Sequence, residues 1–377
     1  MSQRKFPAVF MRGGTSKAIM FHARDLPADR QEWDAIFLSA MGSPDPHGRQ
    51  LDGMGGGVSS LSKVCVIAPS ERDDADVDYT FAQVQIKDAR VDYGANCGNM
   101  SSAVGPFSIE EGLVSATDGD ATVRIYNTNT RKLIHSTFKV QDGRAAVAGE
   151  FAIPGVAGTG APIRLDFIDP GGATTGKLLP SGNASDLIDV PGMGKVEVSM
   201  VDAANACVFV AAKALGLHGT ELPDEIERNP AAMAKFAAIR VQASVAMGIA
   251  RTLDEARART AVPFIGIVSP AQKARTLSGS EIAANEAELA VRMISNGQPH
   301  RALPLTGSLC AAVAARIQGS VVWQACRPDI GDTLRLGMPS GVLTVGAQVS
   351  CEGGAWHAAR GSFYRTARRL FEGYVYA

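Results

Sequence analysis

The chain repeats one structural plan, and this repeat limits the folds that it can adopt. Residues 5–21 have the pattern of a strand, a turn of small residues and a second strand, and residues 195–210 show the same pattern 190 positions later. Further along, Asn96-Cys97-Gly98-Asn99 precedes a helix of small residues, and residues 305–308 precede another at an offset of 209. Strand–turn–strand segments can resemble each other by chance, but two echoes in the same order predict a duplicated fold with a pseudo-twofold axis.

The remaining pattern is typical of an α+β protein in which strands outnumber helices. Alternating or apolar runs between turn residues predict strands at 8–11, 18–21, 64–67, 79–86, 122–126, 133–140 and 145–151. Helical patterns predict helices at 29–41, 98–111, 224–250, 281–295 and 307–317, the fourth with a capping box of Ser278 and Glu281. The Gly- and Pro-rich stretch 154–194 is expected to connect the halves, which places the domains at 1–185 and 186–377, with the last strand free to return to the first domain.

Composition argues against several classes of protein. The 377 residues include 37 Lys and Arg against 38 Asp and Glu, so the net charge of −1 argues against nucleic acid as a partner. The longest near-apolar run, 203–217, is interrupted by Asn205 and Lys213, so we expect no membrane partner. Six scattered cysteines without a CxxC pair, and no HExxH or HxH pattern, indicate free thiols in a cytoplasmic protein and no metal site.

Both echoed turns open a helix with glycine and a small polar residue, Gly98-Asn99 in the first half and Gly307-Ser308 in the second. First-turn N–H groups have no partner inside a helix and lie at its positive end, so such ends bind carboxylates or phosphates. Ordinary glycine-containing helix starts would look the same. Cys97 beside the first start favours function, because the helix field favours the thiolate. We therefore expect a small polycarboxylate ligand and Cys97 as an acid, base or nucleophile.

A glycine-rich segment, residues 51–63, leads into the strand at 64–67. A phosphate-binding P-loop would need Gly-Lys-Ser/Thr before a helix, and a dinucleotide fingerprint would need a strand before the glycines, so neither nucleotide motif fits. A loop that ends in a lysine at a strand start fits a catalytic lysine better, which nominates Lys63. An ordinary lysine pKa of about 10.4 leaves roughly one molecule in a thousand neutral at pH 7, so burial or a cationic neighbour must favour the neutral amine. The alternative is an ordinary surface lysine.

Motifs spread in order over the whole chain resemble the family of 2-methylaconitate isomerase, methylitaconate isomerase and 4-oxalomesaconate tautomerase. They are Met11-Arg12-Gly13-Gly14-Thr15-Ser16-Lys17, Gly42-Ser43-Pro44-Asp45, Gln50-Leu51-Asp52-Gly53, Ser62-Lys63, Asp76-Val77-Asp78-Tyr79, Asn96-Cys97-Gly98-Asn99, Pro180-Ser181-Gly182-Asn183, Pro339-Ser340-Gly341 and Glu372-Gly373-Tyr374-Val375. The resemblance implies a fold similar to diaminopimelate epimerase: two pseudo-symmetric domains, each a sheet rolled round a central helix, with the active site in the interdomain cleft. It implies no metal or organic cofactor and a small tricarboxylate as substrate.

The resemblance also implies a mechanism. Epimerase relatives use one cysteine from each half, but the position that matches Cys97 in the second half is Thr306, which argues against two-thiol racemisation. Lys63 resembles the family's catalytic lysine, so the expected reaction is a 1,3-proton shift along an allyl unit. The amides at Gly98-Asn99 and Gly307-Ser308 would stabilise the dienolate. Either Lys63 or Cys97 would return the proton.

Other residues are assigned to substrate binding by resemblance alone. Carboxylate contacts are expected from Thr15, Ser16, Ser62, Asn96, Asn183 and Ser340. Arg49 and His300 are expected as cationic partners of the substrate, with a structural histidine as the alternative for His300.

The motifs point to more than one substrate. Gly53-Met54-Gly55-Gly56 with Ser59-Ser60 is closer to methylaconitate isomerases, whereas residues 305–310 and 128–130 are closer to 4-oxalomesaconate enzymes. We expect 4-oxalomesaconate, an intermediate of aromatic acid breakdown, with 2-methylaconitate or methylitaconate as the alternative. An amino or hydroxy acid epimerase and a non-catalytic polycarboxylate-binding protein are the other hypotheses. The sequence does not determine the oligomeric state, and a homodimer is a candidate assembly.

Overall fold

The computed structural model describes residues 3–94, 96–260, 262–295, 297–328 and 330–377. The chain forms two compact units, Met1–Asp166 with Tyr364–Ala377, and Phe167–Phe363. The division lies before the expected boundary at 185 and 186, within a strand rather than in the Gly- and Pro-rich stretch. The last strand pairs with the first strand of the chain, so the first unit contains both ends.

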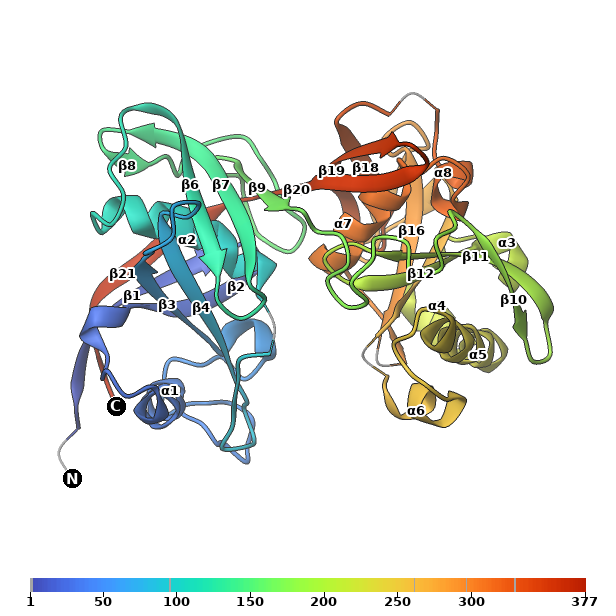
Figure 1. The fold of residues 1–377 in the computed structure, drawn as a ribbon. Helices are drawn as coiled ribbons and strands as arrows, with labels where there is room; N and C mark the ends of the chain where they lie inside the picture. The colour runs from blue at the N-terminus through green and yellow to red at the C-terminus, as the bar shows by residue number, and fades with distance from the viewer. Residues whose placement is uncertain (1–2, 95, 261, 296, 329) are drawn as a thin grey trace. The chain divides into compact units, whose positions relative to one another are not determined.

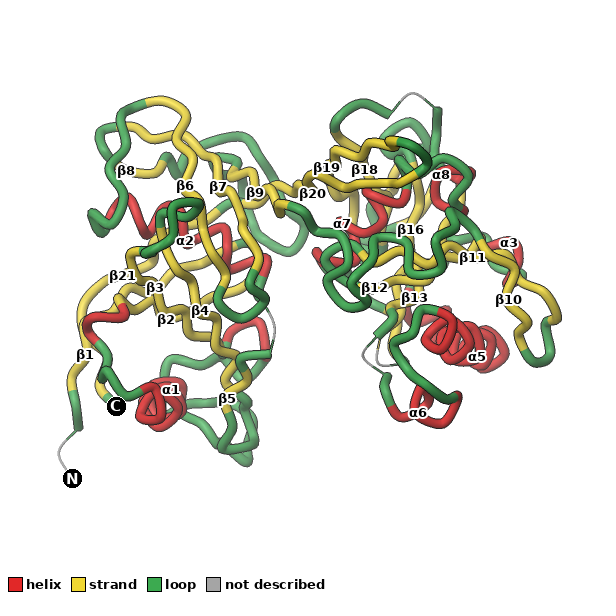
Figure 2. Tube along the Cα trace, in the orientation of Figure 1, coloured by secondary structure: helices red, strands yellow, loops and turns green. Residues whose placement is uncertain are grey.

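The described residues of the first unit form two α-helices and a larger number of strands (Figures 1 and 2). Its elements are β1 (Lys5–Gly13), β2 (Ser16–His22), α1 (Trp33–Met41), β3 (Lys63–Pro69), β4 (Val77–Val84), β5 (Val91–Asp92), α2 (Gly98–Glu110), β6 (Gly119–Asn127), β7 (Lys132–Gln141), β8 (Arg144–Ala145) and β21 (Ala367–Tyr376), with 3-10 turns at Ala23–Asp25, Arg30–Glu32 and Ser59–Leu61. β9 (Ile163–Ile168) carries the chain out of this unit and β20 (Ala355–Arg365) carries it back.

The second unit has more helices than the first. Its elements are β10 (Asp186–Val190), β11 (Gly194–Asp202), β12 (Ala206–Ala211), α3 (Ala212–Leu215), α4 (Pro223–Glu227), α5 (Pro230–Ala246), α6 (Leu253–Ala258), β13 (Phe264–Pro270), β14 (Ala274–Arg275), β15 (Glu281–Ile282), β16 (Leu289–Ser295), β17 (Gln298–Pro299), α7 (Leu305–Ala314), α8 (Val321–Ala325), β18 (Thr333–Met338) and β19 (Gly341–Glu352).

Both units have the same sheet topology. The strand order is β21-β1-β2-β3-β4-β6-β7 in the first and β10-β11-β12-β13-β16-β18-β19 in the second. The parallel pairs are β2–β3 and β4–β6 in the first sheet and β12–β13 and β16–β18 in the second, which are the third and fifth pairings of each order. The other pairings are antiparallel. A parallel pairing needs a crossover connection, and α1 and α2 lie in the two crossovers of the first unit, as α5 and α7 do in the second. The predicted duplication is therefore confirmed in the topology.

Strands enclose one helix in each unit, α2 in the first and α7 in the second. Strands β1, β2, β3, β6, β7 and β21 all contact α2, and every residue of α2 from Met100 to Ile109 is buried. A helix in this position needs small side chains: a Cβ added at Gly105 would lie 2.6 Å from the ring of Phe138. Serine hydroxyls on α2 donate to carbonyl oxygens of the helix itself, which satisfies these buried groups. The sequence pattern of small residues thus matches the central position.

The outer helix of each unit packs against the opposite face of its sheet. Trp33 and Phe37 of α1 join Val64 and Val66 of β3 in one apolar core, and α5 packs in the same way in the second unit. Side chains alternate along a strand, so Lys63 lies on the other face of β3, which is the face that α2 contacts.

Three sequence-based assignments of secondary structure are wrong. The predicted helix at 281–295 is two strands, β15 and β16, because residues 289–295 form a run that is buried throughout and a short apolar run does not distinguish strand from helix. Glu281 pairs with Lys273 rather than capping a helix. The predicted helix at 224–250 is two helices, since Pro230 ends the first and the side chain of Asn229 caps the second.

The third wrong assignment is the strand at 145–151. Only Arg144–Ala145 forms a strand there, and Phe151 makes a single bridge to Gly160. The stretch 154–194 is also more regular than expected, because it contains β9 and β10.

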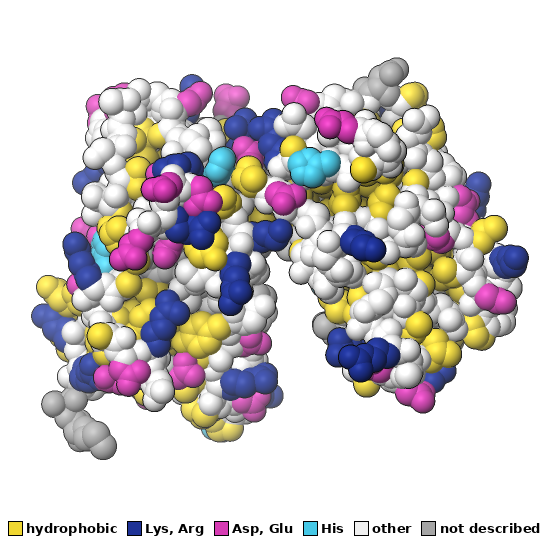
Figure 3. Space-filling view, in the orientation of Figure 1, with side chains coloured by type: hydrophobic (Ala, Val, Ile, Leu, Met, Phe, Trp, Pro, Cys, Tyr) yellow, Lys and Arg dark blue, Asp and Glu magenta, His cyan; other side chains and the backbone are white. Residues whose placement is uncertain are grey.

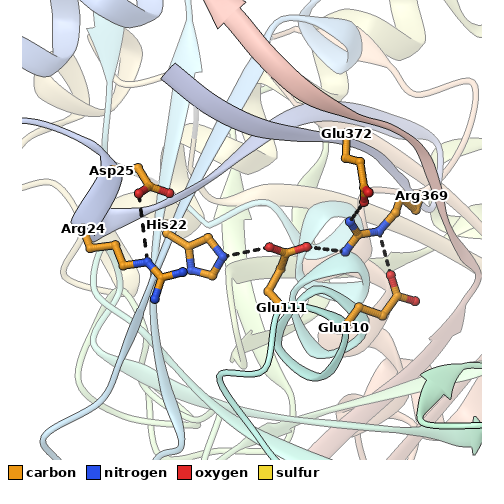
Figure 4. A network of polar contacts seen from close by, with 7 residues as sticks. All are labelled: His22, Arg24, Asp25, Glu110, Glu111, Arg369 and Glu372. Carbon is orange, nitrogen blue, oxygen red and sulfur yellow. Dashed lines mark hydrogen bonds and ion pairs between the residues drawn. The ribbon is translucent and has the colours of Figure 1, made fainter. Parts of the chain in front are cut away.

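An ion-pair network ties β21 to the end of α2 (Figure 4). Glu110 and Glu111 lie at the negative end of the helix dipole, where carboxylates are unfavourable. Arg369 compensates for both, with Nε 2.7 Å from Glu110 and a terminal nitrogen 2.8 Å from Glu111. Partial burial works to raise the pKa of Glu111, but hydrogen bonds from His22 and Arg369 hold it below its usual value. The C-terminal strand therefore stabilises the central helix of the first unit.

We expect Arg369→Ala to lower the free energy of unfolding by about 1–3 kcal/mol at pH 7, because two half-buried carboxylates lose their charged partner. The pKa of Glu111 is lowered by folding, so its contribution is present above its ordinary pKa of about 4.3 and is lost as pH falls below it. The difference in unfolding free energy between variant and wild type should therefore stay constant from pH 7 to about pH 4.5 and narrow as urea unfolding is repeated below that, towards about pH 3. Arg72→Ala, which breaks an exposed pair with Asp74, is the control and should lower the free energy of unfolding much less than Arg369→Ala does. A loss independent of pH would contradict this account.

Candidate active site

Lys63 is the first residue of β3 and its side chain is buried, with 8% of the residue exposed. Lys63 and Gln83 are directly opposite in the antiparallel pair β3–β4. The Lys63 amine donates a hydrogen bond to Gln83 Oε1 at 2.5 Å and lies 4.9 Å from the centre of the Phe81 ring. A lysine held inside the protein by an amide and an aromatic ring, with no carboxylate partner among the described residues, differs from the ordinary surface lysine. This position agrees with the sequence-based nomination.

Hydrogen bonds of the Gln50 side chain hold the glycine-rich segment before Lys63 in place. Gln50 Oε1 accepts from the Gly57 amide at 3.0 Å, and its Nε2 donates to the hydroxyl of Ser62 at 2.7 Å. Ser62 is fully buried and donates to the carbonyl of Val84 at 2.9 Å. The hydroxyl that was expected to bind substrate is therefore engaged in holding this loop to β4.

Cys97 is the N-cap residue of α2, as the sequence predicted, and it is half-buried. Its carbonyl accepts from both the amide and the hydroxyl of Ser101. The first-turn amides of Gly98, Asn99 and Met100 have no acceptor inside the helix. These amides make the start of α2 a place where a carboxylate or an oxyanion can bind.

A buried pair, Cys65 and Tyr79, connects the surroundings of Lys63 and Cys97. Cys65 Sγ lies 3.7 Å from the Tyr79 hydroxyl. Burial raises the pKa of the Cys65 thiol far above its usual value, the nearby Cys97 raises it further, and Lys63 opposes the shift. Burial also raises the pKa of Tyr79, with Cys65 and Cys97 adding to the effect. Both groups stay neutral, and the structure brings Lys63 and Cys97 to the same buried pair.

The β1–β2 turn rests on the start of α2. Asn99 Oδ1 accepts from Arg365 Nε at 3.1 Å and lies 3.4 Å from the Thr15 amide nitrogen. A Cβ added at Gly13 would lie 2.6 Å from the Asn99 carbonyl oxygen, so only glycine allows this approach. Burial lowers the pKa of Arg365 to about 10. Thr15 is exposed beside this turn, whereas Ser16 is buried.

Asn96 and Arg49 were also expected to contact the substrate. Asn96 belongs to the start of α2, and Arg49 lies at the surface of the first unit. The Asn96 side chain accepts from the Ser101 hydroxyl at 3.3 Å, so it belongs to the start of α2. Arg49 is exposed, and its backbone amide donates to Asp45. It lines a pocket of about 590 Å³ with residues of α1, so it is placed on the side of the outer helix rather than beside Lys63.

In the second unit, the start of α7 differs from the prediction. The helix begins at Leu305, so Thr306 is its second residue and does not occupy the capping position that Cys97 has in α2. The Ser308 amide donates to the Pro304 carbonyl at 2.8 Å and its hydroxyl to Leu305, so Ser308 does not offer the free amide that was expected. Gly307 is a close-packing position, since a Cβ there would lie 2.4 Å from the sulfur of Met293.

His300 is partly buried, and its ring is paired with Ser295. Its Nε2 lies 2.5 Å from the Ser295 hydroxyl, and burial lowers its pKa, so the neutral ring is favoured at pH 7. Asn183 is exposed and its side chain donates to Asp186 at 2.8 Å. The Ser340 hydroxyl, in the turn between β18 and β19, is a buried oxygen without a partner in the described ranges. These residues, with Thr306, stay predictions as substrate contacts.

Sequence reasoning missed Gln83, Cys65 and Phe81. The strand predicted at 79–86 contains Phe81 and Gln83, but the register that sets Gln83 opposite Lys63 joins residues 20 positions apart. Nothing local to either residue gives that register.

The described residues contain no group of three or more His, Cys, Asp or Glu placed to hold a metal ion. In the same part of the chain, no helix is long and apolar enough to cross a membrane. On the face shown in Figure 3, acidic and basic side chains are interspersed on each unit.

Comparison with known proteins identifies the chain's relatives. A sequence model of the PrpF protein family matches residues 3–377. The chain belongs to this family. The 3-methylitaconate isomerase of Eubacterium barkeri is 44% identical over 99% of this chain and 97% of its own length. The 2-methyl-aconitate isomerase of Shewanella oneidensis is 38% identical over 100% and 99%, and the 4-oxalomesaconate tautomerase of Pseudomonas putida is 38% identical over 100% and 97%.

Solved structures agree with the PrpF assignment. A crystal structure of methylitaconate-delta-isomerase matches with a TM-score of 0.93 and 44% identity, over 100% of this chain and 96% of that one. A hydroxyproline epimerase from Agrobacterium vitis matches with a TM-score of 0.52 at 12% identity, over 99% and 93%, and so shares the fold alone. This PrpF family protein is therefore an isomerase with an epimerase-like fold, and the resemblance found in the sequence is confirmed.

The burial of the six cysteines gives a test of this geometry. We expect iodoacetamide to modify exposed Cys351 and half-buried Cys97 in the native protein, and to spare buried Cys65, Cys207 and Cys310. Cys326 should react slowly, because burial raises its pKa to about 11 and the thiolate is the reactive form. Peptide mass spectrometry over a time course measures each rate, with the urea-unfolded protein as the control in which all six react. Labelling of Cys65 as fast as Cys97 would contradict the burial described here.

Proposed function

We propose that this protein catalyses a cofactor-independent 1,3-proton shift in a small unsaturated polycarboxylate, with 4-oxalomesaconate as its substrate. The observation that carries the proposal is one buried amine, that of Lys63, held on the same face of the sheet as the start of α2 and Cys97. A base, an anion-binding helix start and a second proton carrier are the groups that such a reaction needs.

In the proposed reaction, neutral Lys63 removes a proton from an sp3 carbon beside a C=C bond. The electron pair of the broken C–H bond moves into the allyl unit and places negative charge on a carboxylate or keto oxygen, which gives a dienolate. A proton then joins the far allylic carbon, delivered by the Lys63 ammonium or by the Cys97 thiol. One C–H bond is broken and one is formed, so no redox partner is needed.

The start of α2 supplies the stabilisation of that charge. The amides of Gly98, Asn99 and Met100 are fixed by the helix before the substrate arrives, so they need no reorganisation as the charge develops. Asn99 is itself held by Arg365 and lies beside the Thr15 amide, which keeps the first turn in place. Preorganised donors of this kind contribute about 3–4 kcal/mol each to transition-state stabilisation in other enzymes.

The choice of substrate rests on motifs of the sequence, and the relatives do not favour 4-oxalomesaconate over the others. The most similar of the three relatives named above is a 3-methylitaconate isomerase, and the other two, at equal identity, differ in substrate. 2-Methylaconitate and 3-methylitaconate are therefore the alternative substrates. Placement in aromatic acid breakdown and in the cytoplasm belongs to the same proposal.

Proton NMR in D2O with the three acids side by side tests the reaction and the substrate together. Deuterium at an allylic carbon together with a moved double bond supports the proposal, and the acid with the highest kcat/KM is the substrate. Exchange at a stereocentre without movement of the double bond would instead indicate an epimerase. Binding without exchange would indicate a binding protein.

Variants separate the roles of the two proposed proton carriers. Lys63→Met should lower kcat by about 10²–10⁴, the usual contribution of a general base, while substrate binding stays measurable by calorimetry. Cys97→Ser should cost less, about tenfold, if Lys63 performs both transfers, and equal losses would show that the two residues share them. Lys139→Met, an exposed lysine on β7 of the same unit, is the control and should keep full activity.

A further inference from the structure

The hydrogen bonds of the Gln83 side chain allow only one orientation of its amide group, and in this orientation its oxygen faces the Lys63 amine. Its Nε2 donates to the carbonyl oxygens of Ser59 at 3.0 Å and Ser62 at 2.8 Å. Its Oε1 accepts from the Lys63 amine. Turning the amide over would set its NH2 group against the amine and its oxygen against two carbonyls, so the network itself determines which end faces Lys63.

The titratable groups on the elements around the amine are two thiols, one phenol and one carboxylate. The thiols of Cys65 and Cys97 and the phenol of Tyr79 are the titratable neighbours on β3, α2 and β4. Asp92 on β5 pairs in register with Gln83, but it is exposed and its carboxylate accepts from the Gly94 amide. Gln83 is therefore the oxygen acceptor that the structure gives to the amine.

We propose that Gln83 is the positioning residue of the Lys63 amine, a neutral acceptor that holds the nitrogen in place in both of its charge states. The inference rests on the proposed role of Lys63 as the base of this enzyme. An amine that takes and returns a proton in every turnover alternates between NH2 and NH3⁺. An amide oxygen accepts a hydrogen bond from either form, so the nitrogen stays over Phe81 throughout the cycle.

The neutrality of Gln83 matters as much as its geometry. A carboxylate at the same place would hold the amine by charge and favour the ammonium, which cannot act as a base. An opposite charge within about 4–6 Å typically shifts a titration by 1–3 pH units. Glutamate has the size of glutamine, so Gln83→Glu adds a charge beside the amine with little change in shape, and it also loses the two hydrogen bonds to the Ser59 and Ser62 carbonyls.

Gln83 also links the amine to the glycine-rich loop, because its two N–H groups are donated to residues 59 and 62. A purely structural role for Gln83 would be limited to this loop. Such a role would lower stability or substrate binding when Gln83 is changed to methionine, but it would leave kcat unchanged. The kcat of Gln83→Met therefore distinguishes a positioning residue from a structural one, and Gln83→Glu tests whether the Gln83 side chain lies beside the amine.

The experiment measures the reactivity of Lys63 towards trace acetic anhydride from pH 6 to 11 by mass spectrometry of its peptide, beside the pH profile of kcat/KM. In Gln83→Glu, we expect the midpoint of Lys63 labelling to rise by 1–3 pH units, and kcat/KM at pH 7.5 to fall about 10- to 1000-fold with recovery at higher pH. Gln141→Glu adds the same charge at the exposed end of β7 and should match wild type in both measurements. An unmoved midpoint in folded Gln83→Glu would overturn the proposal.

Gln83→Met is a second variant that tests the proposal even if Gln83→Glu does not fold. It removes the acceptor without adding charge, so kcat should fall at least tenfold while KM changes less than threefold. A wild-type kcat in Gln83→Met would overturn the proposal. The wild-type protein could show no isomerase activity while Gln83→Glu still shifts the midpoint of Lys63 labelling. That result would support the Gln83–Lys63 contact and reject the proposed function.

Discussion

The enclosure of the start of α2 by β-strands is the constraint on which the rest of the first unit depends. A helix surrounded by strands must have small side chains, and its first turn brings amide groups that the helix cannot satisfy. Gly13 lets the β1–β2 turn approach Asn99, and Gly105 lets Phe138 approach the helix. The same close packing that stabilises the unit thus leaves fixed, unpaired donors beside Cys97 and Lys63.

Lys63 shows how a lysine side chain can be buried beside the central helix. Its stem is buried on the α2 face of β3, and its amine is held by an amide oxygen and an aromatic ring instead of a carboxylate. Neighbouring Cys65 and Tyr79 stay neutral because burial disfavours their charged forms. The amine is therefore held by neutral groups rather than by a carboxylate.

The two units share a topology but not their details. Each has a central helix in the second parallel crossover and an outer helix in the first. The start of α2 carries a cysteine at the cap, whereas α7 begins two residues earlier relative to the matched motif, so Thr306 lies inside the helix and Pro304 occupies the cap. In this duplicated fold the buried lysine and the capping cysteine belong to the first unit.

The sequence by itself determined the duplicated plan, the strands β1 to β4, the central helices and the nomination of Lys63 and Cys97. These follow from local patterns: residue periodicity, glycine before a helix, and motifs in order. Tertiary structure decided what local patterns do not carry. The register of β3 against β4 set Gln83 beside Lys63, burial on both faces made 289–295 a strand, and burial also made His300 neutral and occupied Ser62. The physical reason is that pairing and burial depend on partners distant in the chain.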